Sequence, residues 1–170
     1  MNFKMLAENR YSCRKFLKQN IEKDKVNALL DVIHVAPSAK NCQPIRIWTI
    51  QSEERLMDIK KITKYHYDAP LTIAIGFVAD EAWTRDCDNK NMGIVDASIA
   101  GLSVWLEATE LGLGCVWVSD FDVEKQKEYF PEMAECEIVA FMQIGYPDLK
   151  SKPAKWHYDK KERSKIFCEL

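Results

Sequence analysis

The segment from residue 93 to residue 111 constrains the fold more than any other part of this sequence. It contains no proline and is long enough for about five turns of an α-helix. Apolar side chains would occupy more than one side of that helix: Ile94, Val95, Ile99, Leu102, Val104, Trp105, Leu106 and Leu111. A helix that is apolar nearly all round has to be covered on most of its sides. We therefore expect it to lie in a large core or against another subunit, and to end at Gly112 or Gly114.

Two nearly unbroken apolar runs predict the central strands of a sheet. Residues 71–78 follow an Ala-Pro pair, and residues 139–144 end at Gly145. Runs of this length that are apolar throughout are typical of strands covered on both faces. Shorter runs at residues 45–50 and 115–118 have the composition of two further strands. We therefore expect a sheet of three or four strands.

Three more helices are expected before and between these strands. Apolar residues at helical spacing predict one over 26–36, and the proline that follows stops it. Ser52 and Asp122 are candidate N-caps for shorter helices over 53–61 and 123–130. Helices interleaved with strands fit an α+β or an α/β fold, and the lengths of the connections do not separate these two classes.

Composition limits the classes of protein that this chain can represent. It has 170 residues, 47% of them hydrophobic, and a formal net charge of -2. This size suits one globular domain that buries roughly 70% of its unfolded surface, and the charge argues against a nucleic-acid binder. The six cysteines form no C-x-x-C pair and no Cys/His cluster, so we expect reduced thiols and no metal site. With no signal peptide and no apolar run of membrane-spanning length, we expect a cytoplasmic protein.

Two short motifs flank the first long helix and have the chemistry of a cofactor site. In the stretch Arg10-Tyr11-Ser12-Cys13-Arg14, guanidinium and hydroxyl groups suit a phosphate dianion. The stretch 36–44 (A-P-S-A-K-N-C-Q-P) carries short polar side chains on a turn, which suits a planar heteroaromatic ring. Each motif also fits a plainer interpretation, the first as a basic surface stretch and the second as a loop with good turn chemistry. Their order and spacing favour the cofactor.

These motifs, together with three later pieces of sequence, resemble the nitroreductase family. The later pieces are V-D-A-S-I-A at 95–100, E-L-G-L-G-C-V-W at 110–117 and Q-I-G-Y-P at 143–147. Members of this family are homodimeric flavoproteins. The resemblance therefore implies that this chain forms a homodimer, binds FMN and passes on electrons from NAD(P)H. It also implies an α+β fold, in which helices flank both faces of a mixed sheet and two subunits intertwine. Residues 1–148 would form the FMN-binding domain and 149–170 a basic C-terminal extension that wraps the partner.

The resemblance also assigns roles to residues. Arg10, Tyr11 and Ser12 would meet the FMN phosphate and ribityl chain, and Arg14 would approach the flavin N1/O2 edge. There a fixed guanidinium stabilises the negative charge that two-electron reduction creates. The partner's turn would contribute Pro37, Ser38, Ala39 and Asn41. Backbone N–H groups near flavin N5 would come from Val118, Ser119 and Asp120, and the tail would contribute Lys155. Relatives often have a small residue near Asp120, and many have an arginine where we assign Lys155.

The polar loop 80–91 is the longest interruption between apolar elements, and it offers Trp83 and Arg85 as lining for an acceptor pocket. Alternatively, residues 80–91 form only a surface loop without a role in binding. The function implied is a ping-pong FMN-dependent NAD(P)H oxidoreductase acting on nitroaromatics, quinones or similar acceptors, with no protein acid or base. Two alternatives stay open: a flavin protein that senses or catalyses another reaction, and a dimeric interaction module with a basic tail. The acceptor and the choice between NADH and NADPH are not readable from the sequence.

Overall fold

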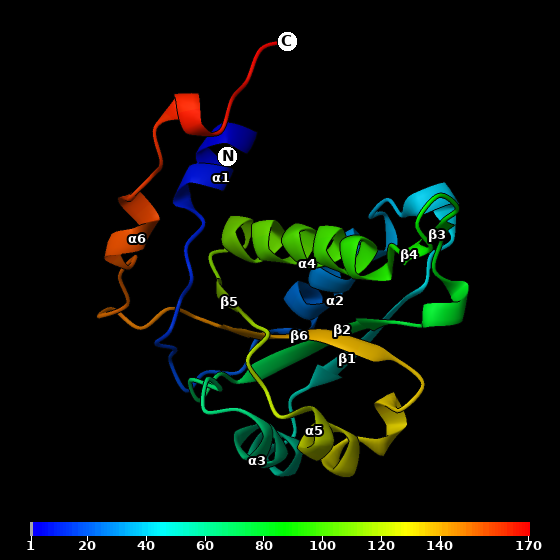
Figure 1. Cartoon of the computed structure of the whole chain (residues 1–170). Coiled ribbons are helices and arrows are strands. Elements are labelled where there is room, and N and C mark those ends of the chain that lie inside the picture. The colour runs from blue at the N-terminus through cyan, green and yellow to red at the C-terminus, as the bar shows by residue number, and fades with distance from the viewer. Residues whose placement is uncertain (1) are drawn as a thin grey trace.

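The centre of the fold is a four-stranded sheet in the order β1-β2-β6-β5 (Figure 1). The computed structural model describes residues 2–170. The strands are β1 (Ile45–Ile50), β2 (Leu71–Phe77), β6 (Glu137–Gly145) and β5 (Gly114–Val118). All three ladders of this sheet are antiparallel, and among residues 2–170 the one parallel pairing is an isolated bridge between Ser12 and Cys115. An antiparallel sheet with helices on both faces confirms the α+β class.

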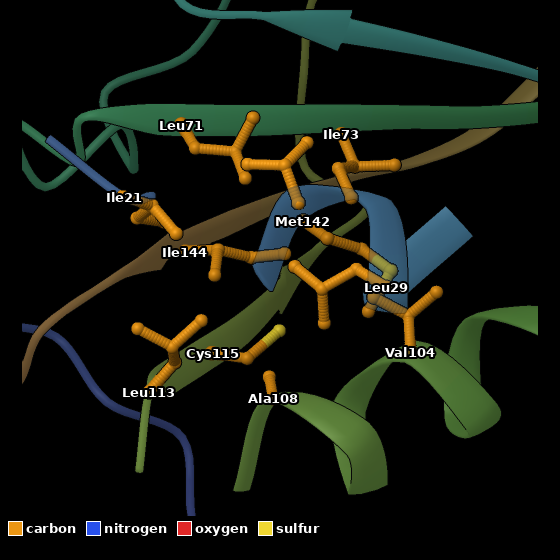
Figure 2. Packing of buried hydrophobic residues seen from close by; sticks show 11 residues of the cluster. Ile21, Leu29, Leu71, Ile73, Val104, Ala108, Leu113, Cys115, Met142 and Ile144 are labelled. Carbon is orange, nitrogen blue, oxygen red and sulfur yellow. The ribbon is translucent and has the colours of Figure 1, made fainter. Parts of the chain in front are cut away.

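The helices divide between the two faces of the sheet (Figure 1). Helices α2 (Lys23–His34) and α4 (Gly93–Glu110) cover one face, and α3 (Glu53–Ile62) and α5 (Val123–Tyr129) cover the other. Figure 2 shows the first layer, where side chains of β2 and β6 meet Leu29 of α2 and Val104 of α4. Leu71, Ile73, Ala74 and Ile75 are all fully buried, because β2 is covered from both sides.

Helix α4 is only partly covered by its own chain. One side packs on the sheet through Ala97, Ala100 and Val104, which are fully buried. The opposite side exposes large apolar residues: Ile94 (52%), Val95 (39%), Ile99 (37%) and Leu102 (49%). The expectation of burial in a large core therefore holds for one side of the helix, whereas its own chain leaves the apolar residues of the other side uncovered.

The predicted helix boundaries agree with the structure where local capping determines them. The side chain of Ser52 accepts a hydrogen bond from Arg55 N at 3.4 Å, and that of Asp122 accepts one from Lys125 N at 3.0 Å. Gly112 follows α4 with a φ of +74°, a left-handed conformation that favours glycine. The helix predicted over 26–36 begins earlier and ends at His34, before the proline is reached.

Several short elements were not predicted. Residues 79–91 hold a 3-10 turn, η2 (Ala79–Glu81), and a two-stranded hairpin, β3 (Thr84–Arg85) with β4 (Lys90–Asn91). The terminal segments add α1 (Phe3–Asn9), α6 (Lys155–Tyr158) and the turn η4 (Arg163–Lys165), and two more 3-10 turns are η1 (Ala39–Asn41) and η3 (Pro131–Met133). Helix α1 lies beside the C-terminal segment (Figure 1). Within residues 2–170, no helix combines the length and the apolar character needed to cross a membrane.

The contact between α4 and β5 predicts a specific response to Gly101→Ala. A Cβ atom at Gly101 would overlap the Trp117 ring, which packs directly on the helix there. We expect the free energy of unfolding to fall by about 1–3 kcal/mol through overpacking, although alanine is the better helix former by about 1 kcal/mol. Urea denaturation measures this change. In a Trp117→Ala background the same substitution should cost nothing, and a cost that persists there would contradict the assignment.

Candidate functional site

The segment from Arg10 to Arg14 is fixed along the outer edge of β5. Cys13 N donates to Cys115 O at 3.0 Å, and Ser12 forms the parallel bridge with Cys115. The Cys13 side chain is fully buried and lies where any side chain at Gly114 would have to be. Anchoring of Cys13 in the core leaves the side chains of its neighbours on the surface of the molecule.

Arg10, Ser12 and Arg14 line one hollow of about 270 Å³, which we call the clamp hollow. The rest of its lining comes from the C-terminal segment: Ala154, Trp156, His157 and Lys160. The Arg10 guanidinium stacks 4.5 Å from the centroid of the Trp105 ring, and Arg14 Nη1 donates to Ser12 O at 3.2 Å. Within residues 2–170 neither arginine forms an ion pair with a carboxylate. Two guanidinium groups and a hydroxyl are thus available to an anion such as a phosphate.

Tyr11 and Lys155 do not line the clamp hollow. The Tyr11 hydroxyl donates to Ser151 Oγ at 3.2 Å, and burial raises the pKa of Tyr11 above its usual value. Tyr11 therefore attaches the C-terminal segment to the N-terminal one. Lys155 is exposed, and Lys160 and His157 stand at the hollow instead. Sequence reasoning missed these two because the path of the tail depends on this contact between residues 140 positions apart.

Val118, Ser119 and Asp120 line a second hollow, the edge hollow, also of about 270 Å³. Its other lining residues are Arg14, Tyr65, Tyr67, Val116 and Trp117. Hydrogen bonds fix its wall: Trp117 Nε1 donates to Ser119 Oγ at 2.6 Å, and Thr63 Oγ1 donates to Asp120 O at 2.7 Å. Arg14 lines both hollows, so they are neighbours along one strip of surface.

The open edge of β5 gives the edge hollow backbone donors. Cys115 O accepts from Cys13 at the outer side of the sheet, and backbone groups of a strand alternate in direction with a period of two residues. The N–H of Trp117 consequently points to the same open side. An unpaired strand edge of this kind can donate to a polar ligand.

The second motif forms a tight turn at the opposite end of α4 (Figure 1). Lys40, Asn41 and Gln43 have positive φ angles of 49°, 57° and 52°, which non-glycine residues adopt rarely. Gln43 N donates to Ser38 Oγ at 2.9 Å, which closes the turn. Pro37 leads into it, and Ala39 N donates to Asp96 Oδ1 at 2.9 Å. Within one chain the two motifs are therefore apart, at the two ends of an 18-residue helix.

The hairpin of residues 84–91 packs next to this turn. Lys40 Nζ lies 5.3 Å from the centroid of the Trp83 ring, so Trp83 supports the turn from outside. Arg85 forms an ion pair with Asp88 across the hairpin, which lowers the pKa of that carboxyl. Trp83 and Arg85 thus lie on the same side of the molecule as the turn, and neither lines the clamp hollow. The part of the chain that the structure describes contains no group of three or more His, Cys, Asp or Glu side chains that could hold a metal ion.

Comparison with known proteins places this geometry in a family. The sequence profile of the Nitroreductase family matches two overlapping segments, residues 7–67 and 60–146. The chain is 26% identical over 157 residues to a Methanothermobacter thermautotrophicus protein named "Putative NADH dehydrogenase/NAD(P)H nitroreductase", covering 82% of this chain and 74% of that one.

Solved structures show the same fold. A nitroreductase family protein from Clostridium difficile 630 superposes with a TM-score of 0.92 at 36% identity, covering 99% of this chain and 98% of that one. A Desulfovibrio desulfuricans protein named "putative nitroreductase", solved in complex with FMN, has a TM-score of 0.81 at 20% identity, covering 100% of this chain and 98% of that one. Since the profile match spans most of the sequence and the fold agrees over nearly its whole length, the chain belongs to the nitroreductase family.

Proposed function

We propose that this protein is an FMN-dependent NAD(P)H oxidoreductase that reduces electron-poor acceptors such as nitroaromatics and quinones. FMN, when bound, would supply the hydride transfer, and the protein would hold and orient it. The observation that carries the proposal is the position of Arg14, which lines both hollows. An elongated ligand with an anionic end and a planar polar end would fit a strip of this kind. The FMN complex of the Desulfovibrio relative supports the choice of cofactor.

The clamp hollow suits the phosphate end of the ligand. Arg10 is held against the Trp105 ring, so its guanidinium is already oriented before a phosphate binds. Ser12 adds a hydroxyl next to it. Lys160 and His157 approach from the tail and can add charge, although a lysine lacks the two-pronged geometry of an arginine. Lys155, which is exposed beside this segment of the tail, would add a further positive charge.

The edge hollow suits the ring end. Arg14 would neutralise negative charge at the N1/O2 edge of the flavin, while backbone N–H groups of the segment 118–120 and the β5 edge would donate to the ring. Asp120 occupies a place where relatives often have a small residue. Its carbonyl is engaged by Thr63, so its backbone orientation is fixed whatever its side chain does.

The proposed site is shared between two copies of the chain. The turn with Ser38, Ala39 and Asn41 lies at the far end of α4 from Arg14, so it can cover the ring only from a partner subunit. The exposed apolar side of α4 supports a two-fold interface along this helix. The hairpin would arrive with the partner's turn, and Trp83 and Arg85 would then line the acceptor pocket. The extension 149–170 would wrap the partner.

The absorption spectrum of the purified protein tests the proposal directly. We expect a yellow protein with flavin bands that bleach when NADH or NADPH is added without oxygen, and whose colour returns when a quinone or nitroaromatic is added. A yellow protein that neither nucleotide bleaches would favour a flavin-binding or sensing role. A colourless protein that takes up no FMN would contradict the proposal.

Arg14→Ala should lower both the affinity for FMN and its reduction potential. A hydrogen bond to a charged group contributes about 1.5–3 kcal/mol, which corresponds to roughly a 10-fold or larger loss of affinity. For a two-electron couple the same energy shifts the potential by about 30–60 mV. Flavin titration and redox titration with reference dyes measure the two effects. Lys18→Ala, at an exposed lysine outside both hollows, is the control and should change neither. An unchanged potential in Arg14→Ala would contradict its assigned place at the ring.

A further inference from the structure

Asp96 is a buried carboxylate that the proposed chemistry does not use. It lies in the first turn of α4 and is only 2% exposed. One oxygen, Oδ1, accepts a hydrogen bond from Ala39 N at 2.9 Å, and the other, Oδ2, has no hydrogen-bond partner among the described residues. A buried charged group with an unsatisfied oxygen destabilises the fold unless something else compensates.

Asp96 is not needed to cap its own helix. The side chain of Asn91 already accepts from Gly93 N at 2.9 Å at the start of α4. The carboxylate of Asp96 reaches out of the helix to Ala39, 57 positions earlier in the chain. Its one hydrogen bond therefore joins the helix to the turn that carries Ser38 and Asn41.

Hydrogen bonds within the turn hold its local shape: Asn41 N donates to Ser38 O and Cys42 N donates to Ala39 O, both at 3.0 Å. Three of its residues have left-handed backbone conformations, which persist only where the surroundings impose them. Ser38 and Gln43 close the turn on itself, and Lys40 rests on the Trp83 ring. Val78 N donates to Pro44 O at 2.9 Å and so anchors the end of the motif, while the hydrogen bond from Ala39 N to Asp96 joins the middle of the turn to α4.

We infer that Asp96 is a positioning residue for the flavin, which it orients through the backbone of Ala39 without touching it. This inference rests on the proposed function, because the turn is taken to cover the partner's FMN. A buried carboxylate with one unsatisfied oxygen fits a residue that serves binding more than stability. Asp96 therefore acts at a distance on a site in the other subunit.

Three variants test the inference by FMN titration. Asp96→Asn keeps an acceptor oxygen for Ala39, so its FMN affinity should stay within about threefold of wild type. Asp96→Ala removes the acceptor and should weaken binding about 10-fold or more. The visible circular dichroism of the bound flavin should change as well, because the ring loses its fixed cover. Met133→Ala, in the core on the other face of the sheet, is the control for a general loss of stability and should leave affinity and dichroism unchanged.

Asp96→Ser replaces the alanine variant if that protein does not fold, since its oxygen stands about one bond short of Ala39 and should give the same loss. Hydrogen exchange without FMN adds a second readout, in which the amide of Ala39 should exchange faster in the alanine or serine variant than in Asp96→Asn. Normal affinity in wild type and in the acceptor-free variant overturns the inference alone. A wild-type protein that binds no FMN overturns the proposed function and the inference together.

Discussion

The pairing of residues 10–14 with the outer edge of β5 is the interaction on which the site depends. Cys13 is buried against Gly114 and hydrogen-bonded to Cys115, so the residues around it have one position relative to the sheet. Arg10 and Arg14 then project along the same strip of surface, one beside the Trp105 ring and one between the two hollows. This short strand-like contact therefore holds the two arginine side chains in a fixed orientation, which a mobile loop could not do.

Helix α4 connects every part of the proposed site. Its buried side packs on the sheet. Its C-terminal half carries Trp105, whose ring contacts Arg10 of the clamp hollow, and its first turn holds the opposite motif through Asp96. Its outer side exposes apolar residues that one chain leaves uncovered. A two-fold axis beside such a helix would bring the first turn of one copy toward the last turns of the other. Such an arrangement would let two motifs at opposite ends of a helix serve one ligand.

Local signals in the sequence predicted the regular elements well. The apolar runs gave β2 and β6, and the caps at Ser52 and Asp122 gave the starts of α3 and α5, because these features depend on neighbouring residues. Non-local contacts could not be predicted. Lys160 lies at the clamp hollow because the C-terminal segment is attached there by the hydrogen bond from the Tyr11 hydroxyl to Ser151. Asp96 looks in the sequence like an ordinary acidic residue at a helix start, and only the fold shows that it reaches Ala39. The family resemblance supplied the rest of the site, which periodicity alone does not contain.

Subunit complementation tests the central claim, that the basic stretch of one chain and the turn of another form one site. One chain would carry Arg10→Ala with Arg14→Ala, and the other Ser38→Ala with Asn41→Ala. Each homodimer should bind FMN poorly, because every site lacks one half. Purified mixed dimers should recover about one high-affinity site per dimer, since one of their two sites combines both intact halves. Mixed dimers that bind FMN no better than either parent would contradict a shared site.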